Sequence, residues 1–403
     1  MQKIEKDNLI DKRIALTIVL QFCILLFNYT IKEVLGIDNT SIRAIISAFF
    51  MIVIGVVYLY NLPYVFKRKG VIITLTYLAF ILLFCINIII YSTPYSEMLD
   101  ISFWFFLICL PSMFYILALE DRKILLELML RSKYLQSFMG IILGIYIVSK
   151  DFHYDMVFSY LLIVPVILLL HEFIFIKKRI SDLLIVLVIS FFIIAIGSRG
   201  PLISIYIYIV LALLYSNKTE AKNLKNIILL VIVVSLSLII LFNYMRILEQ
   251  LELFLSKIGI ISRTIFLLKG EYHDISTGRY DFYTIIFNKL TESPFIGFGI
   301  GGDRVLLDGT YPHNIFLEIL TNFGWLAGIP ICLMFTSISV QGFFRKNKEH
   351  DKQLWIMFFC IGFVPILMSG SYWTSYLFWM FIGICLVNLF ETNKKNDFIK
   401  VEE

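Results

Sequence analysis

The sequence is poor in charge. Only 16% of its 403 residues are Asp, Glu, Lys or Arg, against about 25% in an ordinary soluble domain. Hydrophobic side chains make up 59% of the chain, and a soluble protein of this length cannot hide so many in one core. The composition therefore excludes a soluble globular domain, and it equally excludes a disordered or fibrous chain.

Cysteine is scarce, and none of it lies in a pattern typical of a disulfide or a metal site. All six cysteines fall inside apolar runs, without CxxC or Cys/His spacing. We expect reduced, small hydrophobic side chains there, and we expect neither a metal nor a cofactor.

A signal-peptide cleavage site is missing as well. Lys3, Lys6, Lys12 and Arg13 precede the first apolar run, but no small-residue motif follows it, so this run should remain as the first span.

What the sequence has instead is a series of apolar runs between charged clusters. Because a bilayer-spanning helix needs about 20 apolar residues, these runs predict an all-α polytopic membrane protein of about twelve spans in a single membrane domain. The predicted spans are 14–31, 44–60, 71–91, 101–119, 134–149, 156–176, 183–197, 201–215, 227–243, 315–341, 354–370 and 372–390. The seventh and eighth spans are short, but Gly200-Pro201 between them favours a break over one long helix.

Lysine and arginine sort by side of the membrane. If the N-terminus is cytoplasmic, the inner segments hold 24 of the 35 Lys and Arg residues, the short outer loops hold 4, and one long loop holds the other 7. This asymmetry follows the positive-inside rule and predicts that both termini are cytoplasmic. The long loop, 244–314, then lies on the outer face. Because the charge is sorted by membrane side, we expect no nucleic-acid partner.

The external loop contains most of the candidate chemistry. Its first part, 246–257, mixes charged and apolar residues as in a helix lying at the membrane interface. A second amphipathic helix is predicted to open at Thr277 or Gly278 and to run to Leu290.

Glycines 297, 299 and 302 in the same loop match the G-x-G-x-x-G dinucleotide fingerprint, but the strand that precedes this fingerprint and the parallel sheet around it are missing from the pattern. We interpret Gly297 and Gly299 as a tight turn, or as a source of backbone N–H groups that line a sugar or phosphate pocket.

Arg199 lies on the predicted outer face, where a basic residue runs against the positive-inside bias. It stands between Ser198 and Gly200, just before Pro201, which suits the first turn of a helix. The free amides and the dipole of that helix start, beside an arginine fork, suit a phosphate or pyrophosphate. The alternative is an arginine that reaches to lipid phosphates.

Arg279 repeats this arrangement at the start of the predicted loop helix, where an anion is stabilised by the helix dipole. The alternative is a local ion pair with Asp281 or Asp274.

His313 is a histidine at the predicted outer mouth of the bundle, next to Asn314 and five residues before Glu318. A histidine is the natural base near neutral pH, and Glu318 could orient it or simply occupy the polar end of a span. A carboxylate could serve as the base instead, and the candidates are Glu318, Asp303, Asp308 and Asp274.

Several motifs follow one another in a recognisable order. They are Ser198-Arg199-Gly200 after a span, Thr277-Gly278-Arg279 opening a helix, Pro294-x-x-Gly297-x-Gly299, and His313-Asn314-x-x-Leu317-Glu318 with Gly324 six residues further on. In this order and on one face, they resemble the O-antigen ligase and polymerase family (Wzy and WaaL types). Ser369-Gly370-Ser371-Tyr372 resembles the polymerase-type members.

The resemblance implies a metal-independent, inverting membrane glycosyltransferase that uses glycans linked to polyprenyl pyrophosphate at the outer leaflet of the bacterial cytoplasmic (inner) membrane. It implies that Arg199 and Arg279 bind the donor pyrophosphate and that His313 activates the acceptor hydroxyl. We expect substrate contacts from Ser198, Gly200, Gly297, Gly299, Asn314 and Glu318. The expected partners are the lipid-linked donor and acceptor oligosaccharides and the lipid bilayer, with a flippase and a chain-length regulator as candidates.

Three activities share these features. The Pro-x-x-Gly-x-Gly and Ser-Gly-Ser-Tyr motifs favour a polymerase of O-antigen, capsule or exopolysaccharide repeat units. A ligase that transfers the glycan to a lipid A-core or another acceptor is the first alternative. A flippase or transporter of lipid-linked oligosaccharides is the second, but the span centres are nearly free of charge and the long loop breaks any symmetry between halves.

Overall fold

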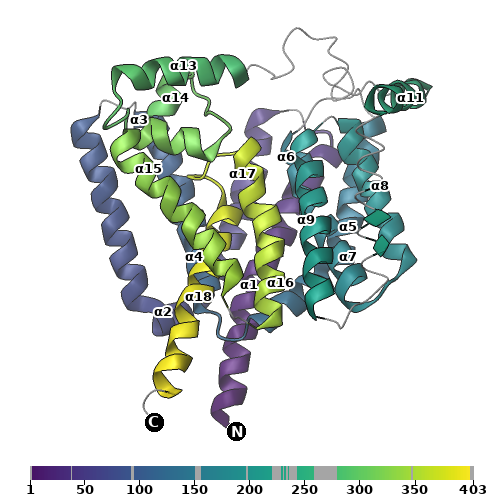
Figure 1. The fold of residues 1–403 in the computed structure, drawn as a ribbon, viewed down its shortest axis with the longest axis horizontal. Coiled ribbons are helices and arrows are strands. Elements are labelled where there is room, and N and C mark those ends of the chain that lie inside the picture. Colours follow the sequence, from purple (N-terminus) through teal and green to yellow (C-terminus); the bar gives the residue numbers. More distant parts are fainter. Residues whose placement is uncertain are drawn as a thin grey trace. The chain divides into compact units, whose positions relative to one another are not determined.

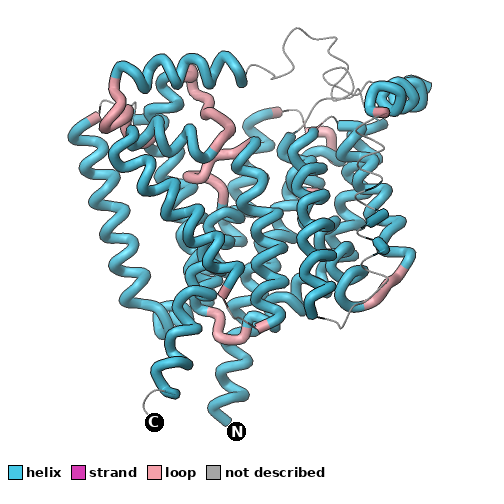
Figure 2. The backbone as a smooth tube through the Cα atoms, viewed as in Figure 1, coloured by secondary structure: helices cyan, strands magenta, loops and turns pink. Residues whose placement is uncertain are grey.

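The computed structural model describes residues 2–37, 39–91, 95–149, 156–196, 198–219, 243–257, 279–345 and 348–399, with isolated positions between 228 and 235. The predicted span 227–243 falls almost wholly outside the described residues, as do Gly197, Asp274, Thr277 and Gly278. Within the described ranges every regular element is a helix (Figure 2). The predicted all-α class is therefore confirmed.

Seven described segments are long and apolar enough to cross a bilayer. They are Asp7–Val34 in α1 (Gln2–Val34), α2 (Thr40–Ile90), Ser96–Ala118, Met156–Ile176, Arg199–Ser216 in α9 (Arg199–Thr219), α15 (Ile315–Phe344) and Glu349–Met368. The backbone of α2 leaves helical geometry at Lys69, so that its 51 residues form two helices. A polytopic membrane protein is thereby confirmed, and the number of twelve spans stays a prediction.

The other helices either make up parts of these segments or are shorter or less apolar. They are α3 (Tyr95–Trp104), α4 (Leu110–Ala118), α5 (Arg122–Ser149), α6 (Met156–Leu161), α7 (Ile163–His171), α8 (Ile180–Ile196), α11 (Tyr244–Lys257), α13 (Arg279–Glu292), α14 (Gly302–Leu306), α16 (Glu349–Phe358), α17 (Val364–Met368) and α18 (Tyr376–Ile399). Two π-helical segments, η1 (Phe105–Cys109) and η3 (Phe359–Phe363), lie between α-helices, and a third, η2 (Glu172–Ile176), ends the helix that α7 begins. Pro111 and Pro365 follow η1 and η3 within two residues, where a prolyl nitrogen cannot donate to the helix ladder.

The chain divides into two compact units. Unit 1 contains residues 1–18, 58–125 and 276–403, and unit 2 contains residues 19–57 and 126–275. The helices α1 and α2 each contribute residues to both.

In unit 2 the break between α8 and α9 falls at the Ser198-Arg199-Gly200 motif. α8 ends at Ile196 and α9 begins at Arg199. A Cβ atom at Gly200 would lie 1.9 Å from the hydroxyl oxygen of Tyr160, so only glycine permits this approach. Ser198 is buried.

The helix α11 packs on the end of α8 through an apolar face. Leu248 and Leu255 are buried against Ala195, whereas Leu253 and Phe254 on another side of α11 are exposed. This division of faces is that of an amphipathic helix, as the sequence pattern predicts.

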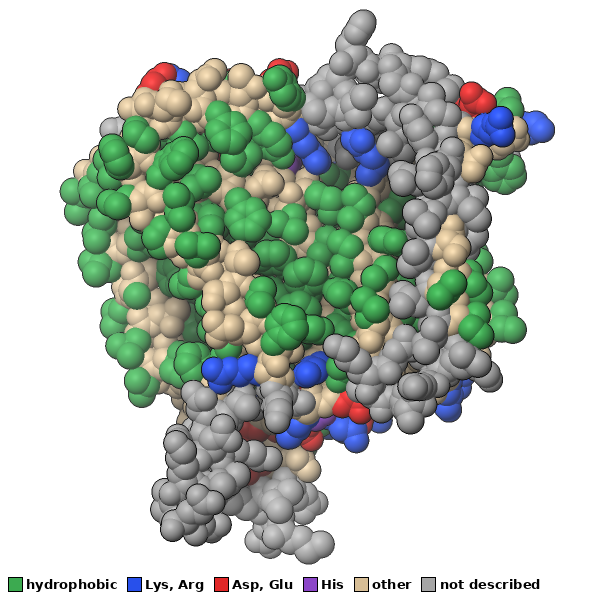
Figure 3. Space-filling model, viewed as in Figure 1, with side chains coloured by type: hydrophobic (Ala, Val, Ile, Leu, Met, Phe, Trp, Pro, Cys, Tyr) green, Lys and Arg blue, Asp and Glu red, His purple; other side chains and the backbone are tan. Residues whose placement is uncertain are grey.

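Within unit 1, the start of α1 and the end of α18 lie at one end, and α13 lies at the opposite end (Figure 1). α13 and α14 both contact α15. The outer surface over α15 is almost entirely apolar (Figure 3); Trp325, Leu326 and Leu333 are each more than half exposed there. Such a surface is stable against lipid and not against water.

A break in α15 receives the glycine-rich loop that precedes α14. At Gly324 the backbone has φ +64°, in the left-handed region. The N–H of Phe298 donates to the carbonyl of Thr321 (2.8 Å), and the N–H of Gly299 donates to that of Asn322 (2.9 Å). Two N–H groups beyond the break donate back to the loop. At the break, backbone groups of α15 that would otherwise form hydrogen bonds within the helix therefore form them with the glycine-rich loop.

Two glycines make this docking sterically possible. A Cβ atom on Gly324 would lie 2.5 Å from the nitrogen of Gly297, and one on Gly297 would lie 2.4 Å from the nitrogen of Gly324. Both backbones also have positive φ. The Pro-x-x-Gly-x-Gly motif therefore holds the glycine-rich loop on α15, which accords with its interpretation as a tight turn.

We predict that Gly324→Ala destabilises the protein by roughly 2 kcal/mol or more, because the new Cβ meets backbone atoms and the residue must keep a positive φ. Thermal unfolding of the purified protein in detergent measures the loss. Gly55→Ala is the matched control, since a Cβ there meets nothing within 4 Å and alanine favours the helix. Equal unfolding temperatures for the Gly324 and Gly55 variants would contradict the account.

Candidate active site

The turn that starts α15 is fixed by Asn314. The Asn314 side-chain oxygen accepts hydrogen bonds from the N–H groups of Phe316 (3.0 Å) and Leu317 (3.2 Å), which is the usual work of an N-cap residue. Its amide nitrogen donates to the carbonyl of Leu367 (3.3 Å). Both ends of this amide are therefore engaged within unit 1, and its predicted contact with substrate stays a prediction.

His313 directly precedes this cap and has an unusual backbone. Its φ is +58°, a region in which histidine is one of the few tolerated non-glycine residues. Its Nδ1 atom is buried and has no hydrogen-bond partner among the described residues. The ring instead contacts two aromatic rings: its centroid lies 4.5 Å from that of Tyr311 and 6.5 Å from that of Phe282 on α13.

Arg279, the first residue of α13, lies close enough to His313 to act on its charge. Burial and the positive charge of Arg279 lower the pKa of His313 to about 4. The imidazole is therefore neutral at physiological pH and able to accept a proton. Arg279 forms no ion pair with Asp281 in the described part of the chain, so the local pair with Asp281 that the sequence allowed is absent.

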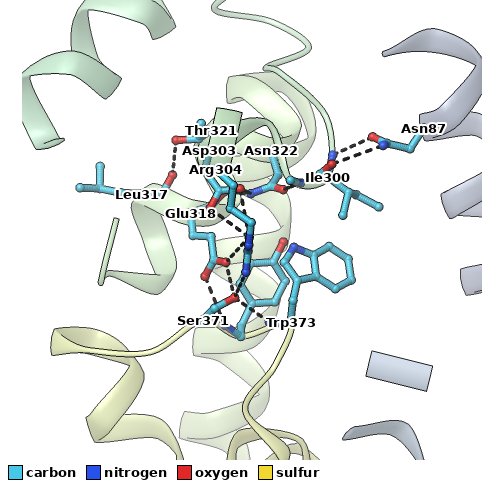
Figure 4. A network of polar contacts seen from close by, with 12 residues as sticks. Asn87, Ile300, Asp303, Arg304, Leu317, Glu318, Thr321, Asn322, Ser371 and Trp373 are labelled. Atoms are coloured by element: carbon cyan, nitrogen blue, oxygen red, sulfur yellow. Dashed lines mark hydrogen bonds and ion pairs between the residues drawn. The ribbon is translucent and has the colours of Figure 1, made fainter. Parts of the chain in front are cut away.

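A buried polar network lies beside this turn, centred on Arg304 of α14 (Figure 4). The Arg304 Nη1 atom lies 3.2 Å from Asp303 Oδ2 and 3.6 Å from Glu318 Oε1, and Nη2 donates to the Ser371 hydroxyl (3.2 Å). Arg304 is 4% exposed and both carboxylates are fully buried. Burial raises the pKa of Asp303, while the guanidinium of Arg304 opposes this.

Glu318 is part of this network, and its contacts in the described part of the chain do not include His313. Its carboxylate accepts hydrogen bonds from the Ser371 hydroxyl and from the N–H of Tyr372 (3.2 Å). Of the two roles that the sequence left open, orienting the histidine or occupying the polar end of a span, the contacts of Glu318 are those of the second. It ties the first turn of α15 to the segment between α17 and α18.

Two asparagines extend the network to the glycine-rich loop. Asn322 accepts from the N–H of Gly301 (3.0 Å) and donates to Asp303 (3.4 Å). Asn87 of α2 accepts from the N–H of Ile300 (2.6 Å). Because consecutive N–H groups of this loop already donate within unit 1, they are not free to bind an anion as the sequence allowed. The predicted substrate contacts of the loop glycines stay predictions.

An apolar groove of about 210 Å³ lies between the end of α2, the glycine-rich loop and α15. Its lining includes Leu83, Ile86, Ile90, Phe295, Phe323 and Leu326. A groove with such a lining suits hydrocarbon and not a sugar.

The structure brings some of the predicted site residues together. Arg279, His313 and Asn314 lie in unit 1 at the start of α15, with Glu318 one turn further along in the buried network. Arg199 lies in unit 2, where it is the first residue of α9. Asp303 joins the network, and Asp308 has a left-handed backbone, with φ +51°, after α14.

The sequence gives no role to Arg304, Asn87 and Asn322, which build the buried network, or to Tyr311, which contacts His313. A signal existed for the asparagines: an amide inside an apolar span is costly unless it finds a hydrogen-bond partner. No such signal marks Arg304 among the other basic residues of the loop.

The fold and these residues define a polytopic α-helical membrane protein with a polar site at the start of α15. Residues 184–332 match the family model described as O-antigen ligase. This part of the chain is thus similar to that family, which confirms the resemblance to the O-antigen ligase and polymerase family that the motifs indicate. Neither a curated protein nor a solved structure matches the chain.

We predict that Arg279→Gln raises the pKa of His313 from about 4 toward its ordinary value of 6.5, because one of the two causes of the depression is removed. Burial remains, so the rise should be partial. Titration of labelled histidine followed by NMR measures it, with His313→Gln identifying the resonance. An unchanged pKa would show that Arg279 exerts no electrostatic effect on the imidazole.

Proposed function

We propose that the protein is a membrane glycosyltransferase that polymerises oligosaccharide repeat units linked to polyprenyl pyrophosphate at the outer leaflet of the bacterial inner membrane. The observation that carries the proposal is the juxtaposition of a neutral imidazole, His313, and the cation Arg279 at the start of a long apolar helix, within the region that matches the O-antigen ligase family. The apolar groove beside α15 supports a substrate with a hydrocarbon part.

The proposed reaction is a single displacement. The oxygen of an acceptor sugar hydroxyl attacks the anomeric carbon of the donor, the bond from that carbon to the pyrophosphate oxygen breaks, and its electron pair leaves with the polyprenyl pyrophosphate. The configuration at the anomeric carbon is inverted. Arg199 and Arg279 hold the charge that develops on the leaving group, as preorganised cations do in a water-poor site.

His313 takes the proton of the attacking hydroxyl. Without substrate its pKa is about 4, which makes the imidazole a weak base. The charge of Arg279 is one reason, and a bound pyrophosphate would offset that charge. Binding of the donor thus raises the basicity of His313 at the moment when a base is needed.

A ligase is the second candidate, because the matching family model is described as O-antigen ligase. Ligase and polymerase share the donor chemistry and differ in the acceptor. Both fit a site on the outer face of the membrane with cytoplasmic termini. A flippase and a chain-length regulator are the proteins that we expect to work beside either enzyme.

We predict that Arg199→Ala, Arg279→Ala and His313→Ala each lower the rate of product formation by roughly 100-fold or more at normal expression, as loss of one charge-stabilising or proton-accepting group does. The assay uses purified protein in liposomes with lipid-linked repeat units and follows the glycan ladder by gel electrophoresis.

Lys289→Ala is the matched control for this series. Lys289 lies on α13, as Arg279 does, and pairs at the surface with Glu292 (2.8 Å), so its removal should leave the rate unchanged. Wild-type activity in any of the three site variants would remove that residue from the mechanism.

Deletion of the gene separates the two candidate activities. We predict that the deletion leaves single repeat units on the final acceptor, because chain extension alone is lost. Polymer that accumulates on the carrier lipid, with none on the acceptor, would identify a ligase instead. The chain-length profile of the surface glycan and of the lipid-linked pool gives both readouts.

A further inference from the structure

The orientation of His313 needs a physical cause, because the usual one is missing. A catalytic histidine is commonly oriented by a hydrogen bond from its second nitrogen to a carboxylate or a carbonyl. Here Nδ1 is buried and has no such partner among the described residues. Glu318, a carboxylate five residues further along the chain, is occupied by Ser371, Tyr372 and Arg304. Something other than a hydrogen bond at Nδ1 must fix the ring.

The ring of Tyr311 provides the closest aromatic contact of the imidazole. The two centroids are 4.5 Å apart with an interplanar angle of 59°. Pro312, between the two residues, is buried, and Asn314 fixes the chain on the other side by capping α15. Phe282 lies further off, at 6.5 Å.

Tyr311 also contacts the buried network, through Arg304. The guanidinium carbon of Arg304 lies 5.6 Å from the centroid of the Tyr311 ring, within the range of a cation–π interaction. Arg304 is itself immobilised by Asp303, Glu318 and Ser371. The contact with this fixed guanidinium restricts the Tyr311 ring, which can therefore restrict the imidazole that packs on it.

We propose that Tyr311 is a positioning residue for the glycosyl transfer, which holds the imidazole of His313 in its productive orientation by ring contact and is itself anchored on the buried guanidinium of Arg304. This inference rests on the proposed function of His313. Because Nδ1 is buried, the nitrogen left to face the acceptor hydroxyl is Nε2. Rotation of the ring would misplace that atom, and a displacement of about 1 Å in a catalytic group can cost 100-fold in rate.

Arg279 on α13 is the charged group that acts on His313 directly. Glu318 on α15, Arg304 on α14 and Arg279 act on the neighbouring Tyr311. Tyr311 keeps its proton at neutral pH, because burial and the nearby Glu318 raise its pKa, although Arg304 and Arg279 oppose the rise. The Tyr311 side chain that contacts the imidazole is therefore a neutral phenol.

The test compares Tyr311→Leu, which removes the ring, with Tyr311→Phe, which keeps it. We expect kcat of Tyr311→Leu to fall at least ten-fold with little change in KM, and the pKa of His313 to rise toward 6.5 as water reaches the imidazole. Tyr311→Phe should retain most of kcat and keep the pKa. Tyr280→Leu, a change at an exposed ring on α13, is the control and should alter neither quantity.

Wild-type kcat in Tyr311→Leu, or an equal loss in Tyr311→Phe and Tyr311→Leu, would overturn the proposal. If Tyr311→Leu does not fold, the contact is measured in the unsubstituted protein. Nuclear Overhauser effects between the Tyr311 and His313 rings are expected, and their absence overturns the proposal equally. The histidine titration needs no activity, so a pKa shift in a protein that forms no glycan would leave the positioning intact and reject the proposed function alone.

Discussion

The buried guanidinium of Arg304 is the point on which the site of unit 1 depends. A charge that is 4% exposed among apolar helices is tolerated only when carboxylates and hydrogen-bond acceptors surround it. Asp303, Glu318 and Ser371 meet this requirement from α14, from α15 and from the segment before α18. Three separate parts of the chain are thereby held at one place, and loss of any one would remove one of the partners of the buried guanidinium.

The same requirement shapes the neighbouring backbone. Asn322 satisfies Asp303 and also receives the N–H of Gly301, so the network continues into the glycine-rich loop. That loop in turn occupies the break of α15 at Gly324. Since Asn314, the N-cap of α15, directly follows His313, the contacts that fix α15 on the glycine-rich loop also fix the position of the histidine, although the histidine takes no part in them. A neutral imidazole beside an arginine results, and this combination suits transfer from an anionic leaving group to a hydroxyl.

The sequence sufficed for the fold class and for the resemblance to the O-antigen ligase family, because both depend on patterns that are local. Apolar run length predicts spanning helices, and Gly200-Pro201 predicts a break, which lies between the end of α8 at Ile196 and the start of α9 at Arg199. The first turn of α15 carries a signal that the sequence analysis did not use, since an asparagine before an apolar run is a typical N-cap.

What the sequence could not predict are pairings between distant positions. Asn87 and Ile300 are 213 residues apart, and Arg304 and Ser371 are 67 apart. No periodicity relates such residues, because their partnership arises only when helices pack. For the same reason the sequence left the role of Glu318 open. Its spacing from His313 allowed a contact with the histidine, whereas in the packed structure Glu318 pairs with Arg304 and accepts a hydrogen bond from Ser371.

The stoichiometry of the transfer tests the central claim most directly. Purified protein in liposomes, supplied with one lipid-linked repeat unit and no other acceptor, should release one polyprenyl pyrophosphate for each glycosidic bond formed, as measured by quantitative mass spectrometry of lipid and glycan. Longer lipid-linked glycans and free carrier lipid should rise together without any ion gradient. Movement of the repeat unit across the bilayer with no new glycosidic bond and no free carrier would contradict the account.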